Sequence, residues 1–302
     1  MKKLFRGRRA LARTAAMATT VVLAATAAGT AVADGSATAS PSAKNASLAT
    51  SRAAAAGKPT PAAPFYFLSG ILPSGQMYVY MPDGKGGFGA RSGAYAWKNF
   101  KYGVSIDLEM TGSQNGAYHV MTDGTLNLWL DGKLKRIGGG WSPYDNVIMP
   151  GALGSAKHPD LLARDKEGYL WRWQSRTDGS LAPRTRIGGG WNQYTQIAGL
   201  GDLTGDSRPD IVARDKQGVL WLYKGTGDLA KPFAQRVQIG GGWNQFNKLV
   251  ATGDVDGDGH SDLLARDAKG DLYLYKGTGR AAAPFKAKVK IGYGFNQYRE
   301  MF

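Results

Sequence analysis

Short apolar runs alternate with turn residues from about residue 65 to residue 302. The pattern is clearest near the end of the chain, where apolar runs at 248–252, 263–265, 272–275 and 289–291 are separated by an aspartate-rich loop, a Lys-Gly turn and a Gly-Thr-Gly turn. Runs of this length, bounded by glycine and aspartate, predict β-strands. Each such unit therefore predicts four short antiparallel strands.

The unit repeats along the chain. The segment Ile-Gly-Gly-Gly-Trp at 137–141 recurs at 187–191 and 239–243 and, in altered form, at 291–295. Trp97 belongs to an earlier, degenerate copy that lacks the glycine run. Successive copies are 44, 50, 52 and 52 residues apart. Four antiparallel strands in a repeat of about 40–50 residues are typical of a β-propeller blade. We therefore predict an all-β fold, a five-bladed β-propeller over residues 65–302.

The two ends of the repeat region predict how this ring closes. The N-terminal unit begins with a second and a third strand, at 67–69 and 77–80, and lacks an innermost strand. Residues 296–302 correspond to the first strand of a further unit. We expect this C-terminal strand to pair with the N-terminal unit and to close the ring non-covalently, because closure removes the free strand edges.

The first 64 residues predict export. Residues 1–33 contain a basic region, an apolar stretch and an Ala-Val-Ala cleavage site, which is typical of a secretory signal peptide; a retained membrane anchor is the alternative. Residues 34–64, rich in Ala, Ser, Thr and Pro, predict a disordered linker. The mature protein is expected to be secreted and extracellular, with no transmembrane segment, and the export route, Sec or twin-arginine, stays open.

Composition excludes several classes of function. The chain has no cysteine and only three histidines, which excludes thiol nucleophiles, disulfides and thiolate zinc sites. The histidines lie at unrelated positions of the repeat, so no catalytic residues are expected and the protein is predicted not to be an enzyme. Part of the net charge of +15 comes from six basic residues of the leader, and the basic residues of the propeller are spread over all blades. This indicates a solvated surface and no nucleic-acid partner.

One loop of the last blade predicts a Ca²⁺ site. Asp254, Asp256, Asp258 and Asp262 occupy positions 1, 3, 5 and 9 of a single tight loop, and His260 at position 7 would contribute its backbone carbonyl. Such a cage of hard oxygens is what Ca²⁺ prefers. The loop is not an EF-hand, because a strand follows it.

The corresponding loops of the earlier blades have fewer carboxylates that could bind a metal ion. The preceding blade has carboxylates or a hydroxyl at the same four positions and a basic residue at position 7: Asp202, Thr204, Asp206, Asp210 and Arg208. The third blade (Ala152, Gly154, Ala156, Asp160) and the second (Glu109, Thr111, Ser113, Ala117) are expected to be metal-free. The alternative for every loop is that the aspartates only form Asx-turns.

These loops, followed by a Leu-Leu-Ala-Arg-Asp strand, resemble the FG-GAP repeats, integrin α-like and VCBS-type, of secreted bacterial proteins. The Gly-Gly-Trp-Asn-Gln segments at 189–193 and 241–245 also resemble the five-bladed tachylectin-type lectins, and this resemblance implies sugar pockets between neighbouring blades. In the recurring segment an indole face can cover the C–H face of a sugar ring and an amide can pair with its hydroxyls, so we expect ligand binding at Trp141, Trp191, Asn192, Trp243 and Asn244.

Two functions follow as hypotheses. In the first, the protein is a secreted, Ca²⁺-binding, lectin-like module whose partner is an extracellular glycan, with the indole faces stacking on sugar rings. In the second, it is a protein-binding or cell-envelope scaffold that binds a cell-surface protein, and the tryptophans wedge between adjacent blades.

Overall fold

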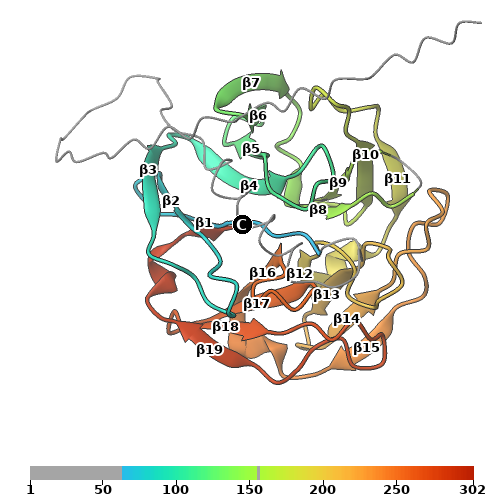
Figure 1. Cartoon of the computed structure of the whole chain (residues 1–302). Helices are drawn as coiled ribbons and strands as arrows, with labels where there is room; N and C mark the ends of the chain where they lie inside the picture. The colour runs from blue at the N-terminus through green and yellow to red at the C-terminus, as the bar shows by residue number, and fades with distance from the viewer. Residues whose placement is uncertain (1–62, 155–156) are drawn as a thin grey trace, which may run out of the picture. The chain divides into compact units, whose positions relative to one another are not determined.

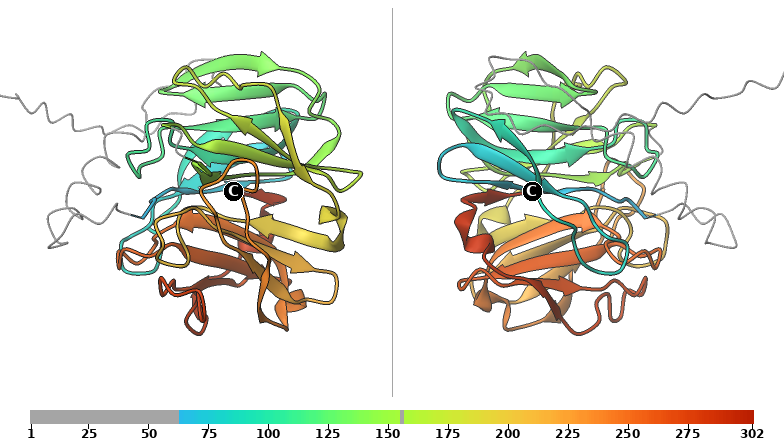
Figure 2. Two further views of the ribbon diagram at one scale, coloured as in Figure 1. Left: turned by 90° about the vertical axis from the view of Figure 1, so that its right-hand side faces the viewer. Right: turned by 60° about the vertical axis from the view of Figure 1, so that its left-hand side comes forward.

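A computed structural model describes residues 63–154 and 157–302. It confirms the all-β prediction, because the described residues form five four-stranded antiparallel sheets arranged as blades around one axis (Figure 1, Figure 2). The predicted signal peptide, 1–33, lies outside the described residues, as does the predicted linker up to residue 62. Within the described part of the chain, no helix is long and apolar enough to cross a membrane.

Four of the blades are continuous in sequence, with the first strand nearest the axis. Their strands are, in blade 2, β4 (Phe100–Ile106), β5 (Gly116–Met121), β6 (Leu126–Leu130) and β7 (Lys133–Gly138); in blade 3, β8 (Tyr144–Gly151), β9 (Asp160–Asp165), β10 (Leu170–Gln174) and β11 (Thr185–Gly188); in blade 4, β12 (Tyr194–Ala198), β13 (Ile211–Asp215), β14 (Leu220–Tyr223) and β15 (Val237–Gly240); in blade 5, β16 (Phe246–Gly253), β17 (Asp262–Asp267), β18 (Leu272–Tyr275) and β19 (Val289–Gly292).

Blade 1 is shared between the two ends of the described chain, as predicted. Its strands are β20 (Glu300–Met301), β1 (Leu68–Ile71), β2 (Gln76–Tyr80) and β3 (Ser92–Ala96), in that order. Met301 pairs with Gly70 and Glu300 with Ile71, and the Ser69 N–H donates to the Phe302 carbonyl at 2.7 Å. The C-terminal strand therefore closes the ring.

Neighbouring blades are joined by a recurring arginine. Arg164, Arg214 and Arg266, from the repeated Ala-Arg-Asp strands, are buried, and each donates from Nη1 to two backbone carbonyls of the turn that enters the next blade. Hydrogen bonds to a charged donor are stronger than neutral ones. The strand motif thus ties each blade to the one that follows.

Residues 64–67 form a strap across one end of the ring, and Figure 1 shows this segment, in blue, crossing the middle of the ring. The Pro64 carbonyl accepts from the Asp254 N–H at 2.7 Å, and the Phe65 N–H donates to the Gly112 carbonyl at 2.7 Å. The strap therefore links the inner ends of blades 5 and 2. Pro64, which the sequence assigned to the linker, already belongs to the folded part.

Candidate functional site

The Asp254 loop connects the two inner strands of blade 5, β16 and β17. Oxygens of Asp254, Asp256 and Asp262 all lie within 4.8 Å of one another, and Asp254 and Asp262 are buried. Among the described residues this is the one place where three His, Asp or Glu side chains come so close. Backbone N–H groups hold the carboxylates in place: those of Gly257 and Gly259 donate to Asp254, and those of Val255 and Gly277 to Asp262.

This geometry fits a Ca²⁺ ion. Ca²⁺ binds oxygens at about 2.3–2.6 Å, so its ligands lie no more than about 5 Å apart, and the three carboxylates meet that limit. Asp258 lies outside the group, where its Oδ2 is 3.4 Å from the Lys286 ammonium. The His260 N–H donates to Asp258 Oδ1, and the His260 ring packs close to Gly279.

The electrostatics of the loop also favour a cation. Burial, with the neighbouring charges of Asp256 and Asp258 adding to it, raises the pKa of Asp262 to about 7. One cation is already near, because the Lys276 ammonium lies 2.9 Å from Asp256 Oδ2. A single ammonium does not compensate three clustered carboxylates, and a divalent cation would lower the cost of holding Asp262 ionised.

The Asp202 loop of blade 4 has the same framework with fewer carboxylates in place. The N–H groups of Leu203 and Gly225 donate to Asp210, as in blade 5, and burial, with the charge of Asp202 adding to it, raises the pKa of Asp210 to about 6. Thr204 and Arg208 occupy positions 3 and 7 as predicted, but Asp206 is exposed. Ser207 has a φ of 64° where blade 5 has Gly259, so this loop carries backbone strain that glycine avoids.

In the loop of blade 2, the residues at the four ligand positions differ from those expected from the sequence. The Leu108 N–H donates to Asn115 Oδ1, as the Val255 N–H does to Asp262, and Asp107 accepts the Gly112 N–H as Asp254 accepts that of Gly259. The four positions are therefore Asp107, Glu109, Thr111 and Asn115, and the assignment ending at Ala117 was wrong by two residues. In blade 3 the Leu153 N–H donates to Asp160 Oδ2, which agrees with the expected register.

The three tryptophans lie between blades. Their exposed fractions are 5% for Trp141 and 6% for both Trp191 and Trp243, and their rings pack 4.5–4.8 Å from those of Trp173, Tyr223 and Tyr275 in the next blade. The expectation of open indole faces is therefore corrected, because these faces are covered by aromatic neighbours. Asn192 and Asn244 are exposed beside them.

The glycine runs shape the turns that hold these tryptophans. Gly190 and Gly242 both have a φ of 83°, a left-handed conformation that glycine adopts without strain. This lets the chain turn into a short 3₁₀ segment at Trp191–Gln193 and at Trp243–Gln245. The backbone N–H of each of these two tryptophans then donates to a glycine carbonyl of the preceding blade, at 2.9 Å. The acceptor is Gly168 for Trp191 and Gly218 for Trp243.

A pocket of about 260 Å³ opens beside the Trp191 turn. Its walls are Ile187, the glycine run at 188–190, the side chains of Gln193, Tyr194 and Tyr223, and the loop at 230–234, which includes Lys231 and Phe233. The pocket therefore lies between blades 3 and 4, and it combines aromatic surface, an amide and accessible backbone. Sequence reasoning missed Tyr223 and the 230–234 loop, since neither belongs to the recurring glycine-tryptophan segment.

Comparison with known proteins gives a family match for part of the chain. No curated protein matches it. Similar solved structures include BBS1N in complex with ARL6DN, with 11% identity and a TM-score of 0.38 over 74% of this chain and 63% of that chain. Human WBSCR16 has 10% identity and a TM-score of 0.34 over 76% and 66%. This chain thus spans less than two thirds of either. The BP39L lectin from Burkholderia pseudomallei has 15% identity and a TM-score of 0.42 over 77% and 71%.

Residues 202–265 match the family model of the FG-GAP-like repeat. The match begins at the first aspartate of the blade 4 loop and ends in β17, so it includes both aspartate loops that the sequence singled out. The described residues therefore form a five-bladed β-propeller in which residues 202–265 match the FG-GAP-like repeat.

Proposed function

We propose that the protein is an exported, non-catalytic binding module, stabilised by Ca²⁺, that binds glycans in the pockets between its blades. The N-terminal sequence supports export, and extracellular Ca²⁺ suits loops with few carboxylates, since extracellular modules bind Ca²⁺ with dissociation constants of about 10⁻⁴–10⁻³ M. Asp254, Asp256 and Asp262 would hold the ion and tie the two inner strands of blade 5 together.

The pocket between blades 3 and 4 carries the proposal of glycan binding. A sugar presents an apolar C–H face and a rim of hydroxyls. The pocket offers the rings of Tyr223 and Phe233 to the first, and the backbone of Gly188–Gly190 to the second. The Gln193 amide, which donates to the Gly190 carbonyl and accepts from Arg236, holds this turn in place. Repetition of the glycine turn around the ring would add avidity on a surface bearing many sugars. Trp191 then has a supporting role, because its ring orders the turn.

The experiment fills the pocket without disturbing the fold. A Cβ at Gly188 meets no atom within 4 Å, and the same holds for Gly138 and Gly240 in the two related turns. A glycan array with the native protein first identifies a polyvalent glycan that binds. We expect the triple variant Gly138→Val, Gly188→Val, Gly240→Val to bind this glycan at least tenfold more weakly than the native protein does. Gly89→Val, in an exposed hairpin of blade 1 with only the Met81 carbonyl nearby at 3.8 Å, is the matched control.

The scaffold hypothesis stays as the second candidate, because the burial of Trp141, Trp191 and Trp243 is what inter-blade packing requires. An array without a bound glycan, or a triple variant that binds as tightly as the native protein, would favour a protein partner and contradict the lectin proposal.

A further inference from the structure

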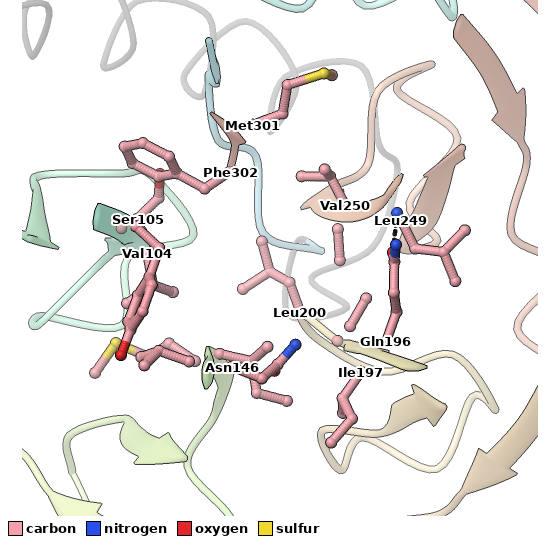
Figure 3. Close-up of a pocket in the computed structure, with 18 of the residues that line it drawn as sticks. Val104, Ser105, Asn146, Gln196, Ile197, Leu200, Leu249, Val250, Met301 and Phe302 are labelled. Atoms are coloured by element: carbon pink, nitrogen blue, oxygen red, sulfur yellow. Dashed lines mark hydrogen bonds between the residues drawn. The ribbon is translucent and has the colours of Figure 1, made fainter. Parts of the chain in front are cut away.

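A second pocket lies on the axis of the ring, apart from the inter-blade pocket. Its volume is about 240 Å³, and residues from the inner strands of all five blades line it together with Tyr66 and Phe67 (Figure 3). This is below the roughly 300–1,000 Å³ of clefts that take drug-sized ligands, so the pocket suits a molecule of about one sugar ring.

The strap gives this pocket a floor. Tyr66 and Phe67 are buried, the Tyr66 N–H donates to the Thr252 carbonyl at 2.9 Å, and the Phe67 N–H donates to Gln114 Oε1 at 3.1 Å. The floor is thus fixed to blades 5 and 2 by hydrogen bonds and is not a loose end of the chain.

Two polar groups of the wall, on Ser105 and Asn146, are uncharged. Ser105 is one of the residues that line the pocket, and its hydroxyl is buried without a hydrogen-bond partner among the described residues. The Asn146 amide points toward the middle of the pocket in Figure 3. Buried polar groups normally have partners, so Ser105 marks a place where a bound molecule or water completes the wall.

The charges that line the pocket compensate one another. Lys248 Nζ lies 2.7 Å from Glu300 Oε1, and Arg164 Nε lies 2.8 Å from Asp145 Oδ1. A charged ligand would therefore lose hydration without gaining a free counter-charge. A purely apolar ligand would leave the Ser105 hydroxyl and the Asn146 amide unpaired, which is costly for buried groups.

We propose that the axial pocket binds an uncharged polyhydroxylated molecule of monosaccharide size. Hydroxyls of such a ligand both donate and accept, so they pair with the Ser105 hydroxyl, the Asn146 amide and the free backbone edges of the inner strands. The side chains of Val104, Leu200 and Val250 and the ring of Phe302, which line the same pocket, would contact its C–H surface. This site is separate from the inter-blade pockets and does not depend on them.

Saturation-transfer NMR on the mature chain tests this proposal with four free probes, D-glucose, D-galactose, N-acetyl-D-glucosamine and myo-inositol. We expect at least one to bind the native protein, and Asn146→Leu or Ser105→Val to weaken that binding at least tenfold. Gly89→Val, in the exposed hairpin of blade 1, should leave it unchanged. Absence of binding by all four probes would overturn the proposal.

A measurement on the native chain avoids any dependence on how the variants fold. A diazirine derivative of the tightest probe is cross-linked and mapped to peptides. Labels within 102–105, 145–149 or 195–200 are expected. Labels confined to 187–191 and 230–234 would show that the sugar occupies the inter-blade pocket, which would overturn the axial proposal while supporting the glycan-binding function.

Discussion

At the residue scale, His119 is the side chain that departs most from the repeat. It occupies the position that Ala163, Ala213 and Ala265 hold in the next three blades, and it is 1% exposed. Its ring packs 4.3 Å from that of Trp97, and neither His119 Nδ1 nor Trp97 Nε1 has a partner among the described residues. Burial lowers the pKa of His119 to about 3, so the folded protein holds a neutral imidazole.

This imidazole predicts a loss of stability in acid. The pKa of His119 is lower in the folded state than in the unfolded state, where it is about 6.5. The contribution of His119 to the free energy of unfolding is therefore complete above about pH 6.5 and is lost as the pH falls toward 3. The slope is about 1.4 kcal/mol per pH unit once the unfolded state is protonated. Urea unfolding at pH 7.5, 5.5 and 4.5 should show this slope in the native protein and not in His119→Ala, which restores the residue of the other blades. Parallel pH profiles for the two proteins would contradict this assignment.

The aspartate loops were predictable from the sequence in blade 5 but not in blade 2. Asp254, Asp256 and Asp262 come together as their spacing predicted, because the loop is short and glycines allow the chain to turn over them. The register of blade 2 was wrong because Asn115 takes the place of Asp262, and an amide oxygen accepts the same backbone N–H as a carboxylate. The spacing pattern alone therefore points to the wrong residues there.

At the element scale, the strap at 64–67 is the feature that the repeat pattern does not contain. Its partners Gly112, Gln114 and Asp254 are remote in sequence, and no copy of the segment exists in the other blades. The strands, in contrast, were predictable because each blade repeats the same apolar runs and turns. An element that is paired once, with distant residues, leaves no such periodic signal.

Gly253 makes the strap possible and provides its test. Its φ is 83°, and a Cβ there would lie 1.7 Å from the Pro64 carbonyl oxygen. We expect Gly253→Ala to destabilise the protein by more than the roughly 1–3 kcal/mol of a strained residue, because the strap must also move. Urea unfolding measures this, and limited proteolysis should show faster cleavage near residue 64.

Gly241→Ala is the matched control for this substitution, since a Cβ at Gly241 meets nothing within 4 Å. It should change the free energy of unfolding by less than about 1 kcal/mol. If both variants unfold at the same urea concentration, the strap does not contribute to stability.

At the scale of the whole molecule, the ring is closed by one short strand. β20 contributes Met301, which is 1% exposed, and its backbone pairs with β1. Deleting 300–302 should lower the free energy of unfolding by at least the roughly 2–5 kcal/mol of losing a buried methionine side chain, and it should expose the edge of β1. Thermal melting of this variant is compared with that of a variant lacking residues 34–60, for which we expect an unchanged transition. Equal tolerance of both deletions would refute closure through β20.

The fold as a whole was predictable to the number and order of the blades, because propeller blades repeat both in sequence and in space. The pockets were not. The inter-blade pocket depends on how the loop at 230–234 lies beside the Trp191 turn, and the axial pocket depends on residues from all five inner strands. Such sites arise from how the elements meet, which the repeat pattern does not encode.

The most direct test of the account is whether Ca²⁺ binds the Asp254 loop and stabilises the propeller. An ion that binds only the folded state adds about 2.7 kcal/mol at a hundredfold excess over Kd. Differential scanning calorimetry of the mature protein, with Ca²⁺ and with chelator, should show a higher Tm with Ca²⁺. Asp256→Ala should abolish most of that difference, whereas Asp206→Ala, in the weaker loop of blade 4, should retain most of it. A thermal transition of the native protein that is the same with Ca²⁺ and with chelator would contradict the account.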